Sequence, residues 1–217
     1  MKKVNLTAYT DAASYNNGKK NFKDPENSSS FGIIIYDRKP LCRISSYNPD
    51  TSISFGELFA IHNTIKWCYD TAIKTEHFIN LVLYTDSAYS FQSITQWMEG
   101  WKKKEVDGKW FNSSGKRVAY QTLLSEIDRY INSDSINVNI KHISGHINLS
   151  NQKDIKKARD VFKRFNNEPL SDYDLAKHVF YNDICDKSAK EFLKLGMRGD
   201  VNSSYEGNER LYEKYFS

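Results

Sequence analysis

Alternating or continuous apolar stretches predict five β-strands along the chain. Val4–Thr10 alternates small or apolar residues with polar ones and ends at Asp11, the pattern of a half-buried strand. Four other stretches have the same character: Phe31–Tyr36, Leu41–Ser46, Asn80–Thr85 and Asn137–Ile143. The turn at residues 37–40 predicts an antiparallel meander, and Ser14–Ser30 is expected to be a polar loop.

Helical spacing of apolar residues separates the later strands. Leu58, Ile61, Ile65, Cys68 and Ala72 predict an amphipathic helix that Ser54 is expected to cap. The other predicted helices run from a cap at Asp86-Ser87 through Ile94, Trp97 and Met98, then along Leu123, Leu124, Ile127 and Ile131, and finally over Asn182–Leu195 up to Gly196. This order of elements predicts an α/β fold with one mixed sheet and helices packed on it.

Acidic residues fall at the ends of these elements, at Asp11, Glu57, Asp86 and Asp186. Each alone is explained by a turn, a helix cap or a surface position. The strand at Asn80–Thr85 feeds a helix, which implies a parallel crossover; if it lies beside the first strand, Asp11 and Asp86 lie side by side. Close carboxylates repel one another, and hard oxygen ligands of this kind suit Mg²⁺. The pattern therefore predicts a metal-dependent phosphoryl-transfer site.

Residues 147–181 form too long a connection between the fifth strand and the last helix, so we expect an insertion there. Within it, Ile155, Ala158, Phe162 and Phe165 follow helical spacing, while Lys153, Lys156, Lys157, Lys163 and Arg164 occupy other faces. The pattern predicts an inserted basic amphipathic helix that ends before Pro169.

The amino-acid composition and the distribution of charge indicate which class of partner the protein binds. The 217 residues carry a net charge of +4, with 39% hydrophobic and 27% charged residues, which is typical of a globular protein. Trp101–Arg117 and Lys153–Arg164 each hold six basic and two acidic residues, a concentration that fits a polyanion partner. No apolar run approaches membrane-spanning length and no secretory signal opens the chain, so we expect a cytoplasmic monomer without membrane contact.

Seven short stretches, in order along this pattern, resemble the type 1 ribonuclease H family. They are Tyr9-Thr10-Asp11, Gly56-Glu57-Leu58, Tyr84-Thr85-Asp86-Ser87, Ile94-Thr95-Gln96-Trp97, Trp101-Lys102-Lys103-Lys104, Ile143-Ser144-Gly145-His146 and Asn182-Asp183-Ile184-Cys185-Asp186. The resemblance implies a ribonuclease H-like domain over residues 1–196, with a five-stranded mixed sheet in βββαβαβα order. Residues 147–181 would be an insertion in this domain and residues 197–217 a C-terminal tail.

The resemblance further implies an endonuclease that hydrolyses the RNA strand of RNA/DNA hybrids by a two-metal-ion mechanism, leaving 3′-hydroxyl and 5′-phosphate ends. Asp11, Glu57, Asp86 and Asp186 match the family's ligands for two Mg²⁺ ions, with Mn²⁺ as an alternative metal. His146 matches the family's histidine near the scissile phosphate, which is thought to assist proton transfer or product release. His142 is interpreted as structural.

The same resemblance assigns candidate contacts to the substrate. Trp97, Trp101, Lys102, Lys103 and Lys104 resemble the family's basic protrusion, which grips the DNA strand of the hybrid. Asn16 and Ser87 are candidate contacts to 2′-hydroxyl groups, the feature that distinguishes RNA from DNA.

Two alternatives stay open at this point. The loop after Asp11 lacks the family's glycine-rich run and position 88 is alanine, which favours a nuclease of the same superfamily acting on another nucleic-acid structure, such as branched DNA. The second alternative is a non-catalytic nucleic-acid-binding module that uses the fold alone. Retention of all four acids argues against it, because a phosphate binder gains nothing from buried negative charge.

Overall fold

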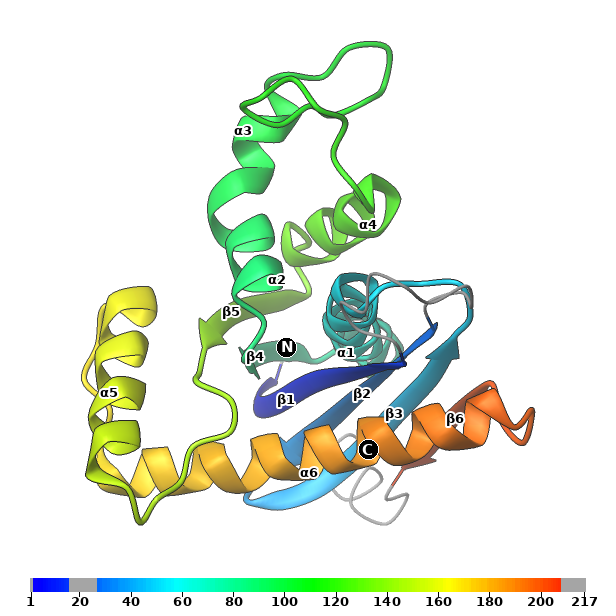
Figure 1. Cartoon of the computed structure of the whole chain (residues 1–217). Coiled ribbons are helices and arrows are strands. Elements are labelled where there is room, and N and C mark those ends of the chain that lie inside the picture. The colour runs from blue at the N-terminus through cyan, green and yellow to red at the C-terminus, as the bar shows by residue number, and fades with distance from the viewer. Residues whose placement is uncertain (1, 16–26, 208–217) are drawn as a thin grey trace.

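One mixed sheet of six strands organises the molecule (Figure 1). The computed structural model describes residues 2–15 and 27–207, and the strand order in the sheet is β5-β4-β1-β2-β3-β6. The strands are β1 (Lys3–Tyr15), β2 (Asn27–Tyr36), β3 (Lys39–Asn48), β4 (Phe78–Thr85), β5 (Ile136–His142) and β6 (Ser203–Gly207). The sequence predicted five of them. The sixth comes from the segment expected to be a tail, where it pairs antiparallel with β3 and covers that strand's edge.

The pairing of β1 with β4 sets up the site. These two strands are parallel neighbours, which is the condition for Asp11 and Asp86 to lie side by side, and Thr10 lies opposite Thr85. β5 continues the parallel part beyond β4, whereas β2 and β3 pair antiparallel as the predicted meander. Since Asp11 and Asp86 directly follow the paired threonines, the register brings the two acids to the same end of the sheet.

β1 and β2 are longer than predicted, because a run of small residues is buried where a polar loop was expected. Ala12, Ala13 and Ser14 continue β1 and pair with Ser30, Ser29 and Ser28 of β2. The three serines of β2 are buried, and Ser29 Oγ donates a hydrogen bond to the Ala189 carbonyl oxygen at 2.6 Å. Buried small polar residues look like a loop in sequence, and only packing from both faces reveals them as strand. Asn16 lies outside the described residues.

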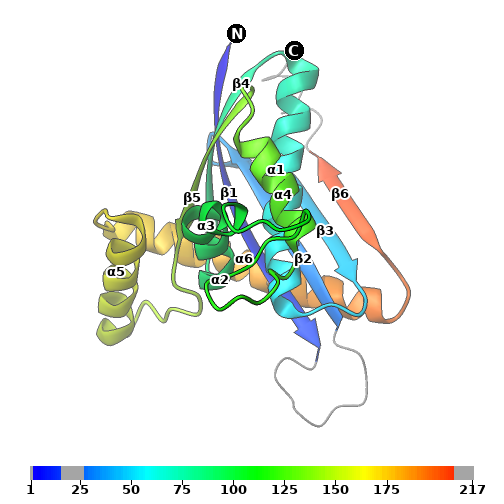
Figure 2. The same cartoon turned by 90° about the horizontal axis from the view of Figure 1, so that it is seen from above.

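Helices cover the sheet on both faces (Figure 2). α1 (Ile53–Thr75) and α4 (Gln121–Ile131) lie on one face and α6 (Asp172–Met197) crosses the other. Successive residues of a strand point to opposite faces, so Leu6 and Ala8 of β1 join the apolar cluster under α1, while Tyr9 joins the cluster under α6. This two-sided core fixes β1 firmly at the centre of the fold.

Two helix boundaries differ from prediction. Ser52, not Ser54, caps α1, and its hydroxyl oxygen accepts a hydrogen bond from Phe55 N at 3.3 Å. α6 begins at Asp172, capped by Ser171, ten residues before the predicted start at Asn182, and it continues past Gly196. Gly196 serves close packing here and does not end the helix, because a Cβ at this position would lie 2.2 Å from Cγ of Tyr47.

Two projections leave the body on the side of β5 (Figure 1). The first is a helical column made of α2 (Ala88–Gln92), a π-helical turn at Ser93–Trp97 and α3 (Met98–Lys102). The second is α5 (Gln152–Asn166), the predicted inserted helix, which lies beyond the edge of β5. In the described part of the chain, no helix combines the length and apolarity that crossing a membrane requires.

Candidate active site

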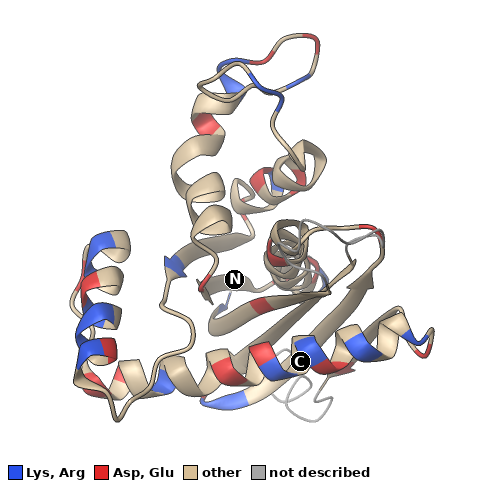
Figure 3. Ribbon diagram, in the orientation of Figure 1, with Lys and Arg blue, Asp and Glu red and all other residues tan. Residues whose placement is uncertain are grey.

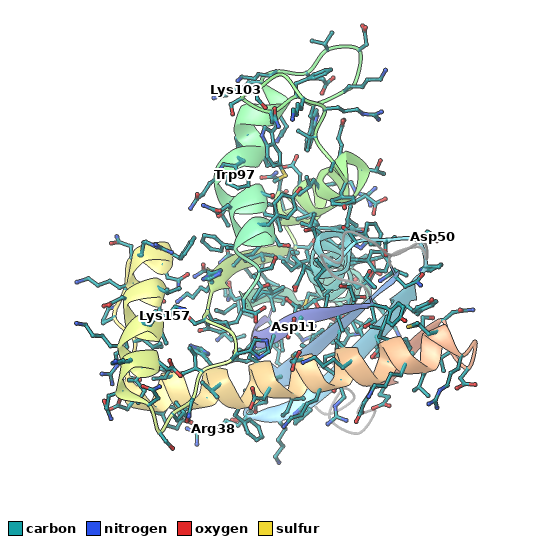
Figure 4. All side chains as sticks on the ribbon, viewed as in Figure 1. Asp11, Arg38, Asp50, Trp97, Lys103 and Lys157 are labelled. Carbon is teal, nitrogen blue, oxygen red and sulfur yellow. The ribbon has the colours of Figure 1, made fainter. Side chains whose placement is uncertain are left out.

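Three carboxylates from separate elements converge in one cleft. Asp11 comes from β1, Glu57 from the first turns of α1 and Asp86 from the residue after β4, and an oxygen of each lies within 4.8 Å of the others. The cleft has a volume of about 930 Å³, and Ser87, His146 and Asp186 also line it. Figure 4 shows Asp11 at the centre of the molecule, above α6.

The close approach of α1 to the sheet places Glu57. A Cβ at the neighbouring Gly56 would lie 3.0 Å from both Ala12 Cβ and Ser28 Oγ, so the small residues on each side let the helix start sit directly on β1 and β2. The Glu57 side chain is thereby buried against Asp11. Its Oε2 atom is buried and has no hydrogen-bond partner among the described residues.

Groups on β5, its following loop and α6 hold Asp86. Asn182 Nδ2 donates to Asp86 Oδ2 at 3.2 Å, and His142 Nε2 donates to the Asp86 main-chain oxygen at 3.2 Å. Gly145 lies against the same carboxylate, because a Cβ there would be 2.2 Å from Asp86 Oδ2. The carboxylate is therefore confined by a donor on one side and a glycine main chain on another.

Burial makes these carboxylates hard to ionise together. Burial, reinforced by the nearby charge of Asp86, raises the pKa of Asp11 to about 8. The pKa of Glu57 and that of Asp86 are also raised, in each case chiefly by burial. The donor set consists of hard oxygens, and the unpartnered Glu57 Oε2 is an oxygen that a cation would satisfy. The residues present thus fit a divalent cation such as Mg²⁺.

Asp186 lies in the same cleft but outside the group of three close acids. Its carboxylate accepts a hydrogen bond from Lys190 Nζ at 2.6 Å, one helical turn along α6. Of the four predicted acids, the structure therefore brings three together and places the fourth beside them, paired with a lysine.

His146 and Ser87 also line the cleft. His146 has a left-handed main chain, with φ of 53°, and its charge helps to offset the rise in the pKa of Asp86. Ser87 caps α2, where its hydroxyl oxygen accepts from Ser90 N at 3.3 Å. Both predicted residues thus lie within the cleft that holds the acids.

Comparison with known proteins fits this geometry. The sequence model of the RNase H family matches residues 3–161, which is more than half of the chain. The chain belongs to the RNase H family. The match ends within α5, so it includes Asp11, Glu57, Asp86 and His146 but stops before Asp186.

Individual proteins with similar sequences are also ribonucleases H. The chain is 33% identical to Ribonuclease H1 of Rattus norvegicus over 95 residues, which are 43% of this chain and 31% of the relative. It is 29% identical to Ribonuclease H of Ehrlichia canis over 153 residues, covering 68% of this chain and 88% of the relative. The aligned part thus spans about a third of the length of the mammalian relatives.

Among solved structures, LC9-RNase H1, a type 1 RNase H with the type 2 active-site motif, has a similar fold. Its TM-score is 0.53 at 16% identity, over 85% of this chain and 86% of that chain. The predicted ribonuclease H-like fold is confirmed, with a sixth strand added to its sheet.

The helical column of this RNase H family member and the turn directly after it carry the predicted protrusion residues, of which Figure 4 labels Trp97 and Lys103. Trp97, Trp101 and Lys104 line a separate depression of about 570 Å³, and the two indole rings lie 5.8 Å apart. Lys103 and Lys104 are exposed. Lys102 instead forms ion pairs with Glu99 at 2.8 Å and with Asp128 at 2.9 Å. The three lysines are therefore not equivalent, since the first is occupied within the protein.

The structure adds residues around the cleft that the sequence did not single out for a role. Asn182 and His142 bind Asp86, and Lys190 binds Asp186. Lys190 had a signal in the sequence, because it follows Asp186 by four residues on a predicted helix. The contacts of Asn182 and His142 with Asp86 join segments far apart in sequence and had no local signal.

Proposed function

We propose that this chain is an endonuclease that hydrolyses the RNA strand of RNA/DNA hybrids with the help of divalent metal ions. The observation that carries the proposal is the convergence of Asp11, Glu57 and Asp86, with one buried oxygen unpartnered, in an open cleft of an RNase H fold. Buried carboxylates at this spacing destabilise the metal-free protein, so their arrangement is explained by a cation they bind.

The metal ligands would be Asp11, Glu57 and Asp86, with Asp186 completing the set from α6. Two Mg²⁺ ions bound there, or Mn²⁺ in their place, would activate a water and stabilise the leaving oxygen of a phosphodiester, giving 3′-hydroxyl and 5′-phosphate ends. Asn182 and His142 hold Asp86 in position, and Lys190 holds Asp186. His146 lines the same cleft and would move a proton at the scissile phosphate.

Substrate positioning falls to the helical column. Lys103 and Lys104 are exposed, and no ion pair among the described residues involves either of them, so they would contact phosphates of the DNA strand. Trp97 and Trp101 would offer apolar surface to the sugars. Ser87 and Asn16 would contact the RNA strand. Support for the hybrid as substrate comes from relatives named ribonuclease H and from a similarly folded foamy viral protease-reverse transcriptase (TM-score 0.51, 12% identity) whose structure contains an RNA/DNA hybrid.

A cleavage assay tests the proposal. End-labelled RNA/DNA hybrid, duplex DNA and duplex RNA of one sequence are incubated with the protein in Mg²⁺ and in excess chelator. We expect cleavage of the RNA strand of the hybrid alone, and only with metal. Asp11→Asn should abolish it, whereas Asp50→Asn, the same change at an exposed turn, should not. Cleavage of another duplex would favour the alternative nuclease, and metal-independent binding without cleavage would favour a binding module.

A further inference from the structure

The inserted helix α5 carries a face rich in positive charge (Figure 3). Lys153, Lys156, Lys157 and Arg164 are exposed and line a shallow depression of about 350 Å³ along the helix. No ion pair found among the described residues involves any of these four side chains. The acid in the same depression is Asp160, so the face keeps an excess of positive charge.

The opposite face of α5 is fixed to the body. Ala158 and Phe162 are buried, and Phe162 stacks on His178 of α6 with ring centroids 5.7 Å apart. At the helix end, the Phe165 ring lies 4.3 Å from that of His142. Asn166 accepts a hydrogen bond from His142 N at 2.9 Å and donates one to His142 O at 2.7 Å. The basic face is therefore held at a defined place and does not swing freely.

That place borders the candidate active site. His142, which anchors the end of α5, also donates to the main-chain oxygen of Asp86, so one residue links α5 to the acid cluster. In Figure 4, α5 with Lys157 lies to the left of Asp11, and the helical column with Trp97 rises above it. The two basic projections thus flank the acids from different sides.

We propose that the basic face of α5, defined as Lys153, Lys156, Lys157 and Arg164, binds the phosphate backbone of the hybrid duplex outside the cleft. This inference rests on the proposed function and extends it by a second phosphate-binding surface. The 15 residues of α5 span about 22 Å at 1.5 Å per residue. At a rise of about 3.4 Å per phosphate on each strand, this length matches about six phosphates of one strand. Such contacts position a duplex and carry no chemistry.

The test measures hybrid binding in an Asp11→Asn background with Mg²⁺, so that substrate cleavage does not interfere. The variant K157Q/R164Q removes one lysine and one arginine from the basic face of α5. The matched control, R38Q/K39Q, removes one arginine and one lysine at the β2–β3 turn. That turn lies at the end of the sheet away from Asp11. β2 reaches it after Ile35, which pairs with Thr7 of β1, whereas Asp11 pairs with Phe31 farther along β1. Fluorescence anisotropy over a salt series gives affinity and its salt dependence for each protein.

We expect K157Q/R164Q to weaken binding of a hybrid of about 24 base pairs several-fold, and to reduce the slope of log affinity against log salt by up to about 0.9 per removed contact. The same substitutions should reduce the affinity for a hybrid of about 8 base pairs, about 27 Å long, by a smaller factor. A duplex of this length cannot occupy the cleft and the full length of α5 together. The control should match the parent protein. Equal slopes for K157Q/R164Q and R38Q/K39Q, with unchanged melting temperatures, would overturn the inference.

Failure of this inference is separable from failure of the proposed function. The Michaelis constant and turnover of the same pair of variants, made in the otherwise unchanged chain, give a second readout. K157Q/R164Q should raise the Michaelis constant for the long hybrid and leave turnover at saturation unchanged. If the wild-type chain cleaves the hybrid and K157Q/R164Q has the same Michaelis constant and turnover, the role of α5 is refuted and the nuclease activity stands. If the wild-type chain does not cleave, the nuclease activity itself is refuted.

Discussion

His142 and Asp86 are joined by a hydrogen bond from the imidazole Nε2 to the main-chain oxygen at 3.2 Å. Burial lowers the pKa of His142 to about 4, so the ring is neutral at neutral pH and carries its proton on Nε2. Its Nδ1 atom is buried without a hydrogen-bond partner among the described residues. Among the described residues, the ring nitrogens of His142 therefore make one hydrogen bond, from Nε2 to the main-chain oxygen of Asp86. This bond fixes the main chain of a candidate metal ligand.

Replacing His142 by phenylalanine should separate this positioning role from packing. H142F keeps an aromatic ring against Phe165 but removes the N–H donor. We expect the Mg²⁺ concentration for half-maximal cleavage to rise about tenfold, as for other residues that orient metal ligands. The gain in melting temperature on adding Mg²⁺ should shrink accordingly. H142Q, which retains an N–H donor, should recover part of both effects; equal metal dependence in H142F and the parent would contradict the role.

We expect that no side chain can replace the hydrogen of Gly145 without displacing the Asp86 carboxylate. A Cβ there would lie 2.2 Å from Asp86 Oδ2, so G145A should push the carboxylate away from Asp11 and Glu57. We expect turnover to fall at least about tenfold, the cost of misplacing a metal ligand. The matched change G100A, at a helical glycine with open space around it, should leave turnover intact and stabilise the fold by about 0.5–1 kcal/mol. Normal turnover in G145A would show that Asp86 can shift without consequence.

The acid cluster predicts an unusual pH dependence of stability without metal. Burial raises the pKa of Asp11 to about 8 in the folded protein, against an ordinary value of 3.8. Between these values the folded state holds a proton that the unfolded state has released, so this group's contribution to stability falls as pH rises from about 4 to about 8. D11N should remove that contribution and raise the melting temperature in chelator at pH 8, with a smaller gain at pH 5. A gain that is equal at both pH values would argue against the raised pKa.

The lysines of the helical column should contribute unequally to binding. Lys102 is paired with Glu99 and Asp128, whereas Lys103 and Lys104 are exposed. We expect K103Q/K104Q to weaken hybrid binding and to lower the salt slope by up to about 0.9 per lysine. K102Q should change affinity little and instead loosen the contact of α3 with α4. The assignment fails if K102Q alone lowers the salt slope as much as the double variant.

The sequence by itself determined the strands and helices with strong periodicity and the acids at the ends of the first and fourth strands. It did so because Val4–Thr10 and Asn80–Thr85 have clear strand patterns and each ends at an acid, and a parallel register then places Asp11 beside Asp86. The basic inserted helix was equally clear, because its apolar and charged residues separate onto two faces.

Only the tertiary structure decided which residues support the acids and where the elements end. The buried serines of β2 look polar in sequence, and their place in the sheet depends on α1 and α6 packing over them. Likewise, Gly145, His142 and Asn182 act on Asp86 from segments 56 to 96 residues away along the chain. Local periodicity reports the environment along one element, whereas these contacts arise only when the loop after β5 and the helix α6 close over the end of β4.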